Sequence, residues 1–281
     1  IDIRNLKRKL TFCGVDVLVA ELEYKLYRSV FYSRGEIYIT LEEFKSQLNK
    51  IKTLVIEQHQ SLYLDELESL IIKVNLFGFH FASLDIRQNS KIHDAVFKDI
   101  YDFYIKSNES VFPKNYYDLS EQDKFEVLSN VKGALNPDDF ENEITRLTIE
   151  SIQAIKVIQG NNGELGANRY IISNNENALN VMETFALIRL SDWENPTVDV
   201  VPLFESVDDL LNAHNVMEQL YTNPVYANHL VNREMKQTIM LGFSDGTKDG
   251  GYLMANWSIY KAKEELTAIS RKYGIKVIFF D

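Results

Sequence analysis

The sequence of 281 residues contains a single cysteine, Cys13. One thiol excludes an internal disulfide and a cysteine-based zinc site, and it fits a reducing compartment, so we expect a cytoplasmic location. No apolar run approaches the roughly 20 residues that a membrane-spanning helix needs, which predicts a soluble protein with no membrane partner. The first residues carry too many charges for a secretory signal, and no initiator methionine is present.

Positive charge is also scarce. There are 30 lysines and arginines against 41 acidic residues, which gives a formal net charge of -11. An acidic protein repels polyanions, so nucleic acids and anionic membranes are not expected as partners. An anionic substrate would therefore have to be attracted by a local cluster of cations. The composition, 45% hydrophobic and 12% aromatic, is otherwise typical of a globular protein with a large core.

The order of apolar patterns predicts a helix-rich α/β protein. Residues 1–75 show helical spacing and are expected to form an N-terminal helical block, in which Thr40 caps a helix that begins at Leu41. In residues 76–281, strands alternate with helices, which predicts a partial (β/α) barrel with parallel strands and a helical insertion at about 91–160.

Five strands are expected in that barrel. The first covers residues 77–86, an aromatic-rich run that is apolar on both faces, as a central parallel strand is. The other strands are expected at 169–173, 198–204, 237–243 and 275–280, with helices at 178–190, 207–221 and 252–272. Gly274 is expected to cap the last helix, and Ser206 and Asp209 to form a capping box. Pro202 weakens the third strand, because proline cannot donate a hydrogen bond to a neighbouring strand.

The stretch QTIMLGFSDGTKDGG, residues 237–251, concentrates the chemistry of the chain. Its apolar strand is expected to break into a polar turn at 244–251, before the next helix begins. The turn contains two carboxylates, an ammonium group and three glycines. A simple connection does not need so many charged groups, which indicates a functional site, although an ordinary polar loop remains the alternative.

Glu205 and Asp245 each follow a predicted strand, so a barrel would place both carboxylates on the same rim. Two oxygen ligands with room for water suit Mg²⁺ or Mn²⁺. The alternative interpretation is structural: Glu205 would cap a helix, and Asp245 would make a turn through its own backbone.

Two cations would complete such a site. Arg87 offers a planar fork to a carboxylate or phosphate, and Lys248 offers a point charge. Each could equally form an ordinary salt bridge with an aspartate nearby in the sequence. Histidines would supply general bases, but His80 lies in the aromatic-rich run and is more typical of a core residue, and we assign a catalytic role neither to it nor to His93.

Three stretches resemble the phosphoenolpyruvate carboxylase family. They are FGFHFASLDIRQNS at 77–90, VVPLFESVDDLLNAHNVMEQL at 200–220 and MLGFSDGTKDGGYLMANWSIYKAKEEL at 240–266, with YIIS at 170–173 as a weaker match. They occur in the order that the family has them. The third stretch departs slightly from the family signature, with Gly-Thr where small residues are usual.

The resemblance implies a carbon–carbon lyase that joins phosphoenolpyruvate to bicarbonate and releases oxaloacetate and phosphate, using Mg²⁺ or Mn²⁺. In the family's route, bicarbonate attacks phosphorus to give carboxyphosphate and an enolate, and CO₂ then reacts at carbon. Carried over to this sequence, Glu205 and Asp245 match metal ligands, Arg87 matches a substrate-binding catalytic arginine, and Lys248 is a further catalytic candidate. The parent enzyme is expected to be an anaplerotic, cytoplasmic homo-oligomer.

Two family features are missing from the sequence. No Thr-Ala-His-Pro segment, which carries the proton-handling histidine, is present, and neither is the Gly-Arg-Gly-Gly loop. We therefore expect an internal fragment of a longer enzyme that is inactive alone, with an open barrel that favours self-association or marginal stability. Two alternatives remain open: a non-catalytic, helix-rich interaction module, and another phosphoenolpyruvate-using barrel enzyme with a different acceptor.

Overall fold

The computed structural model describes residues 12–32, 38–107 and 111–280. The chain divides into two compact units. The first comprises residues 1–83 with 157–166, and the second comprises residues 84–156 with 167–281. No helix in the described part of the chain is both long and apolar enough to cross a membrane.

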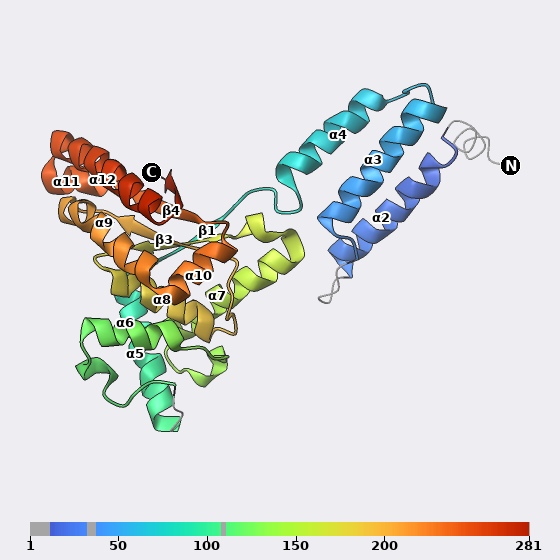
Figure 1. Ribbon diagram of the computed structural model, residues 1–281. Helices are drawn as coiled ribbons and strands as arrows, with labels where there is room; N and C mark the ends of the chain where they lie inside the picture. The colour runs from blue at the N-terminus through green and yellow to red at the C-terminus, as the bar shows by residue number, and fades with distance from the viewer. Residues whose placement is uncertain (1–11, 33–37, 108–110, 281) are drawn as a thin grey trace. The chain divides into compact units, whose positions relative to one another are not determined.

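The first unit is built on α2 (Val15–Phe31), α3 (Leu41–Gln58) and α4 (Leu64–Phe77), which lie side by side in Figure 1. The backbone N–H of Glu43 donates to the Thr40 hydroxyl at 3.1 Å, which confirms the predicted cap of α3. Leu22, Leu48 and Ile51 are buried between the helices and form the core of this unit. The described residues of the predicted block at 1–75 are therefore mainly helical, whereas residues 1–11 and 33–37 of that block lie outside the described residues.

The strand predicted at residues 77–86 is wrong. Helix α4 continues to its C-cap at Gly78, whose φ of 52° is easily adopted by glycine at a helix end. The side chains of Phe81 and Leu84 are 76% and 66% exposed, so the apolar residues here do not fill the core of a sheet. The first strand begins only at Asp85.

The second unit contains a five-stranded parallel sheet in the order β1-β2-β3-β4-β5. Its strands are β1 (Asp85–Asn89), β2 (Arg169–Ser173), β3 (Asp199–Phe204), β4 (Lys236–Leu241) and β5 (Lys276–Phe280). The predicted helix-rich α/β class with parallel strands is confirmed. Strand β1 lies at an edge of the sheet, not at its centre as predicted, and β5 forms the other edge. The closed form of a barrel stays a prediction.

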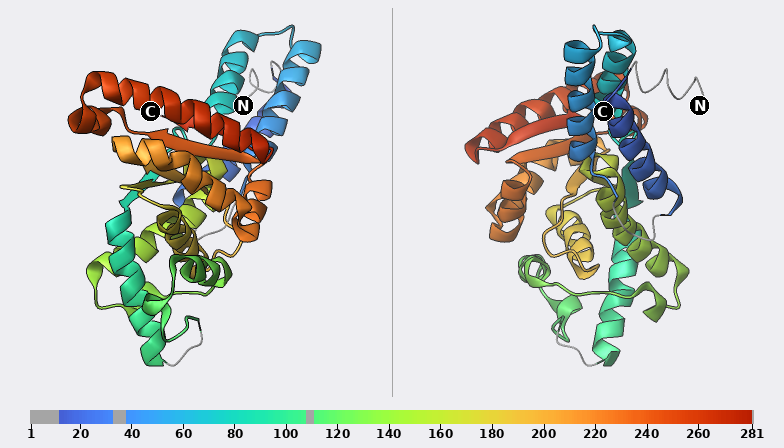
Figure 2. Two further views of the ribbon diagram at one scale, coloured as in Figure 1. Left: turned by 60° about the vertical axis from the view of Figure 1, so that its left-hand side comes forward. Right: turned by 90° about the vertical axis from the view of Figure 1, so that its right-hand side faces the viewer.

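Helices follow the strands along the chain. They are α5 (Ser90–Ser107), α6 (Glu121–Asn130), α7 (Glu143–Asn162), α8 (Ala178–Leu190), α9 (Val207–Thr222), α10 (Pro224–Asn232), α11 (Phe243–Gly250) and α12 (Tyr252–Lys272). Of these, α5, α8, α9 and α12 pack consecutively, each against the next, as expected when strand order follows chain order and crossovers share one hand (Figure 2). Helix α8 is buried along most of its length, so it forms the centre of this layer.

Residues 244–251 were expected to form a polar turn, but they lie mostly in helix α11. Asp245 in its first turn and Lys248 in its last turn both complement the helix dipole, which favours a helix over a turn. Gly251, with a φ of 81°, separates α11 from α12. Helix α12 has the bounds predicted for it, and Gly274 follows its end with a φ of 70°, as expected for a glycine cap.

Pro202 is accommodated inside β3 because it lies just before the residues that pair with β4. The pairing of β3 with β2 runs from Asp199 to Pro202 itself, which lies opposite Ile172, whereas the pairing with β4 begins at Leu203 opposite Met240. The side chain of Gln237 on β4 donates a hydrogen bond to the carbonyl of Val200 at 3.0 Å. A buried side chain therefore takes the place of ladder hydrogen bonds beside the proline.

His93 on α5 is a fully buried core residue. Its Nε2 lies 2.9 Å from the Tyr170 hydroxyl, and its Nδ1 lies 2.9 Å from the Thr184 hydroxyl. Burial lowers the pKa of the imidazole to about 4. This histidine is therefore neutral in the folded protein and structural in its contacts.

We expect acid to destabilise the fold through His93. Below about pH 6.5 the unfolded chain binds a proton at this residue, whereas the folded chain does so only near pH 4, so stability falls as the pH falls between these values. The variant His93→Gln lacks this titration. Urea denaturation measures how much lower its free energy of unfolding is than that of the parent sequence. This difference should shrink by about 2–3 kcal/mol when the pH is lowered from about 7.5 to about 4.5. An equal deficit at both pH values would contradict the assignment.

Candidate functional site

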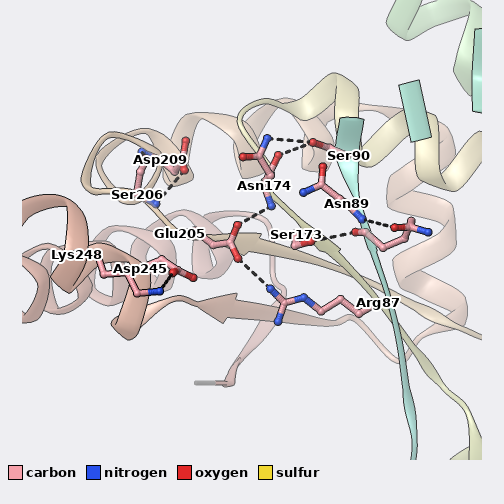
Figure 3. Close-up of polar contacts among 11 residues, drawn as sticks. Arg87, Asn89, Ser90, Ser173, Asn174, Glu205, Ser206, Asp209, Asp245 and Lys248 are labelled. Carbon is pink, nitrogen blue, oxygen red and sulfur yellow. Dashed lines mark hydrogen bonds and ion pairs between the residues drawn. The ribbon is translucent and has the colours of Figure 1, made fainter. Parts of the chain in front are cut away.

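The carboxyl ends of the strands bring together polar residues that are far apart in the sequence. Arg87 lies on β1, Glu205 directly follows β3, and Asp245 lies in the first turn of α11, after β4. In a parallel sheet these ends share one edge, which is where ligands of such folds usually bind. Figure 3 shows the side chains at this edge.

Both oxygens of the Glu205 carboxylate accept hydrogen bonds. Arg87 Nη2 donates to Oε1 at 3.0 Å, and the backbone N–H of Asn174 donates to Oε2 at 2.7 Å. The Glu205 side chain is only 19% exposed, while that of Arg87 is 49% exposed. Because Asn174 directly follows β2, the carboxylate links the ends of β1, β2 and β3 (Figure 3).

Asn174 presents its N–H to Glu205 because its backbone adopts a left-handed conformation, with φ of 54°. Such a conformation is uncommon outside glycine, although asparagine tolerates it better than most residues. The Ser90 hydroxyl donates to the Asn174 carbonyl at 2.6 Å, which fixes the turn from the β1 side. Asn174 and Ser90 are not among the predicted site residues. The available signal was an asparagine immediately after a correctly predicted strand.

Asp245 forms an ion pair on its own helix. Lys248 Nζ donates to Asp245 Oδ1 at 2.7 Å, and this hydrogen bond raises the pKa of the lysine. Both side chains are accessible, at 51% exposure for Asp245 and 77% for Lys248. The lysine therefore pairs with the predicted metal ligand itself.

The connection from β4 to α11 packs directly on Glu205. The N–H of Gly242 donates to the carbonyl of Phe204 at 2.8 Å, and a Cβ at Gly242 would come within 3.1 Å of the Glu205 Cα. Asp249 Oδ2 accepts from the N–H of Val207 at 3.1 Å. The contacts of Gly242 hold the start of α11 against the end of β3, and that of Asp249 holds its last turn against the start of α9. A side chain at Gly242 would have to displace the Glu205 backbone slightly.

The structural alternative for Glu205, capping of helix α9, is not what the structure shows. Ser206 caps this helix: its hydroxyl accepts from the N–H of Asp209 at 3.1 Å, and the Asp209 carboxylate accepts from the N–H of Ser206 at 3.0 Å. The predicted capping box is confirmed. Glu205 is consequently free of a capping role.

Glu205 and Asp245 are the two predicted metal ligands, and each carboxylate already accepts a hydrogen bond from a cation. Within residues 12–32, 38–107 and 111–280, no group of three or more histidine, cysteine, aspartate or glutamate side chains is placed to hold a metal ion. A site made by Glu205 and Asp245 would therefore have two carboxylates and several waters, as is usual for Mg²⁺. A carboxylate has about four acceptor positions, so the hydrogen bonds at Glu205 leave capacity for a metal.

A family model described as phosphoenolpyruvate carboxylase matches residues 16–281. The chain belongs to the phosphoenolpyruvate carboxylase family. It is 34% identical over 259 residues to the phosphoenolpyruvate carboxylase of Nitrosomonas eutropha and 31% identical over 261 residues to that of Nitrosomonas europaea. Each alignment covers 88% of this chain and 27% of the relative. The chain thus spans about a quarter of the length of the curated phosphoenolpyruvate carboxylases that it matches.

The left-handed turn predicts the effect of replacing Asn174. Asn174→Gly keeps the backbone conformation, whereas Asn174→Val forces a β-branched residue to a positive φ. Both variants lose the asparagine side chain, so they form a matched pair. We expect the valine variant to be less stable than the glycine variant by at least about 1 kcal/mol in urea denaturation. Equal stabilities would show that the turn can move away from Glu205 at little cost.

Proposed function

We propose that this chain is part of a phosphoenolpyruvate carboxylase, which carboxylates phosphoenolpyruvate with bicarbonate to give oxaloacetate and phosphate. Glu205 and Asp245 would bind Mg²⁺ or Mn²⁺, and Arg87 and Lys248 would act on the substrate. The supporting observation is that one sheet edge carries two carboxylates and two cations, within a chain that belongs to this family. An acidic protein needs such a local group of cations to attract an anionic substrate.

The described contacts suit charge stabilisation at this edge. A bound dication would stabilise negative charge as it develops on substrate oxygens. Arg87 presents a planar guanidinium that is half exposed, and only Nη2 donates to Glu205, so its other N–H groups can bind a phosphate or carboxylate. Lys248 is more exposed, and its flexible side chain can keep a positive charge close to the phosphoryl group during transfer.

We further propose that the 281-residue chain does not turn over substrate by itself. It spans 27% of the length of the relatives, and the proposed site supplies metal ligands and substrate cations. Its role would be to bind the metal and one anionic end of the substrate.

Titration with Mn²⁺ tests the metal ligands. Isothermal titration of the chain should show one site, and Asp245→Asn or Glu205→Gln should each weaken it at least about tenfold, because each removes one of two charged ligands. Asp138→Asn is the matched control, since this exposed aspartate lies in a separate short helix. The Asp138→Asn variant should bind Mn²⁺ with the same affinity as the parent sequence. Undiminished binding in Asp245→Asn would reject the proposed site and favour a non-catalytic module.

Lys248 should compete with the metal for Asp245. Lys248→Met removes this ion pair, so we expect Mn²⁺ to bind about two- to fivefold more tightly, in line with the small free energy of an exposed pair. Lys261→Met, which breaks a pair with Glu264 at the same spacing on α12, is the matched control. Weaker Mn²⁺ binding in Lys248→Met would mean that the lysine does not compete at this carboxylate.

A further inference from the structure

A polar cavity lies near the amino-terminal end of the sheet. Its volume is about 160 Å³, and residues of α8, of α10 and of the segment before β3 line it. Helix α8 begins after the carboxyl end of β2 and runs back toward the start of β3, so its last turn lies away from Glu205. The cavity is therefore separate from the site described above.

A buried cation, Arg189, forms one wall of this cavity. The residue is only 7% exposed, and Nη1 donates to the carbonyl of Ser129 at 2.6 Å. Its guanidinium carbon also lies 5.7 Å from the centre of the Phe185 ring. Among the described residues, no carboxylate forms an ion pair with it. An arginine is always charged, and a buried charge is costly unless it has a counter-ion.

The other charged groups around the cavity compensate this positive charge only in part. Burial lowers the pKa of Arg189, and Glu194 only partly opposes that effect. Glu194 is itself paired with Lys132 at 3.0 Å. His229 is neutral, because burial and then Arg233 lower its pKa to about 3.

Three asparagines surround the opening: Asn195, Asn228 and Asn232. All are exposed, and no side-chain hydrogen bond of theirs is formed within the part of the chain that the structure describes. Asn228 and Asn232 are four residues apart on α10, so both amides lie on one face of that helix. Their NH₂ groups can therefore donate to a ligand that enters from solvent.

We propose that this cavity binds a small oxyanion, a carboxylate or a phosphate, as the counter-ion of Arg189. Water occupies about 30 Å³ in the liquid, so the cavity has the volume of about five waters. That is enough for inorganic phosphate or a short carboxylate, and it is well below the roughly 300 Å³ of a typical pocket for larger ligands. The guanidinium binds the anion at the base, and the asparagine amides bind it at the rim.

The test is a titration of the isotopically labelled full chain with inorganic phosphate and, separately, with acetate. The side-chain amide NMR signals of Asn228 and Asn232 should shift saturably with at least one of the two anions, and the better probe identifies the preferred oxyanion. Arg189→Met should weaken this binding at least about tenfold. Glu194→Gln should tighten it about two- to fivefold, because it removes the negative charge at the opening.

Two further variants keep the result decisive. Arg87→Met is the matched control at the opposite end of the sheet, and it should leave the shifts at Asn228 and Asn232 unchanged. If Arg189→Met does not fold, Asn228→Asp places a negative charge at the exposed rim and should weaken binding at least about fivefold, as read from the amide signal of Asn232 alone. The proposal is overturned if the shifts do not saturate with either anion, if they persist undiminished in the cavity variants, or if Arg87→Met abolishes them.

Discussion

The carboxylate of Glu205 is the interaction on which the candidate site depends, because it joins three strand ends through two hydrogen bonds of unequal strength. The pair with Arg87 is half exposed, and such a pair contributes only about 0–1 kcal/mol. A hydrogen bond from a backbone N–H to a charged acceptor is worth about 1.5–3 kcal/mol, so the contact from Asn174 is the stronger one. Arg87 can consequently exchange Glu205 for a substrate oxyanion at little cost, while the carboxylate stays in place.

Periodicity in the sequence was sufficient to locate much of the second unit. The strand at 169–173 and the helices at 178–190 and 252–272 have the predicted bounds, since their apolar residues face a core and their ends carry capping residues. Aromatic content misled the prediction at 77–86, where the side chains are largely exposed. The glycines of the polar stretch at 244–251 predict a turn, but its charges complement a helix dipole and the stretch lies mostly in α11.

The site residues were predicted from type and position, but their contacts could not be. Glu205 and Asp245 follow strands and Arg87 lies within β1, so their common edge follows from a parallel sheet. That Arg87 pairs with Glu205, 118 residues away, depends on register and rotamer. The contribution of Asn174 depends on a single backbone angle, and the exposure of Arg189 to a cavity depends on how α8 and α10 pack.

The junction between β3 and β4, next to Pro202, is a seam in the sheet, that is, a line along which few backbone hydrogen bonds join the two strands. The ladder between β3 and β4 is short, and beside Pro202 it is replaced by the Gln237 side chain, whereas β4 and β5 pair over five residues. Glu205 and Asp245 lie on opposite sides of this seam. A ligand that bridges them adds its binding free energy to the junction between β3 and β4, and opening of that junction would release the ligand. Ligand binding at Glu205 and Asp245 and the stability of the pairing between β3 and β4 are therefore thermodynamically linked.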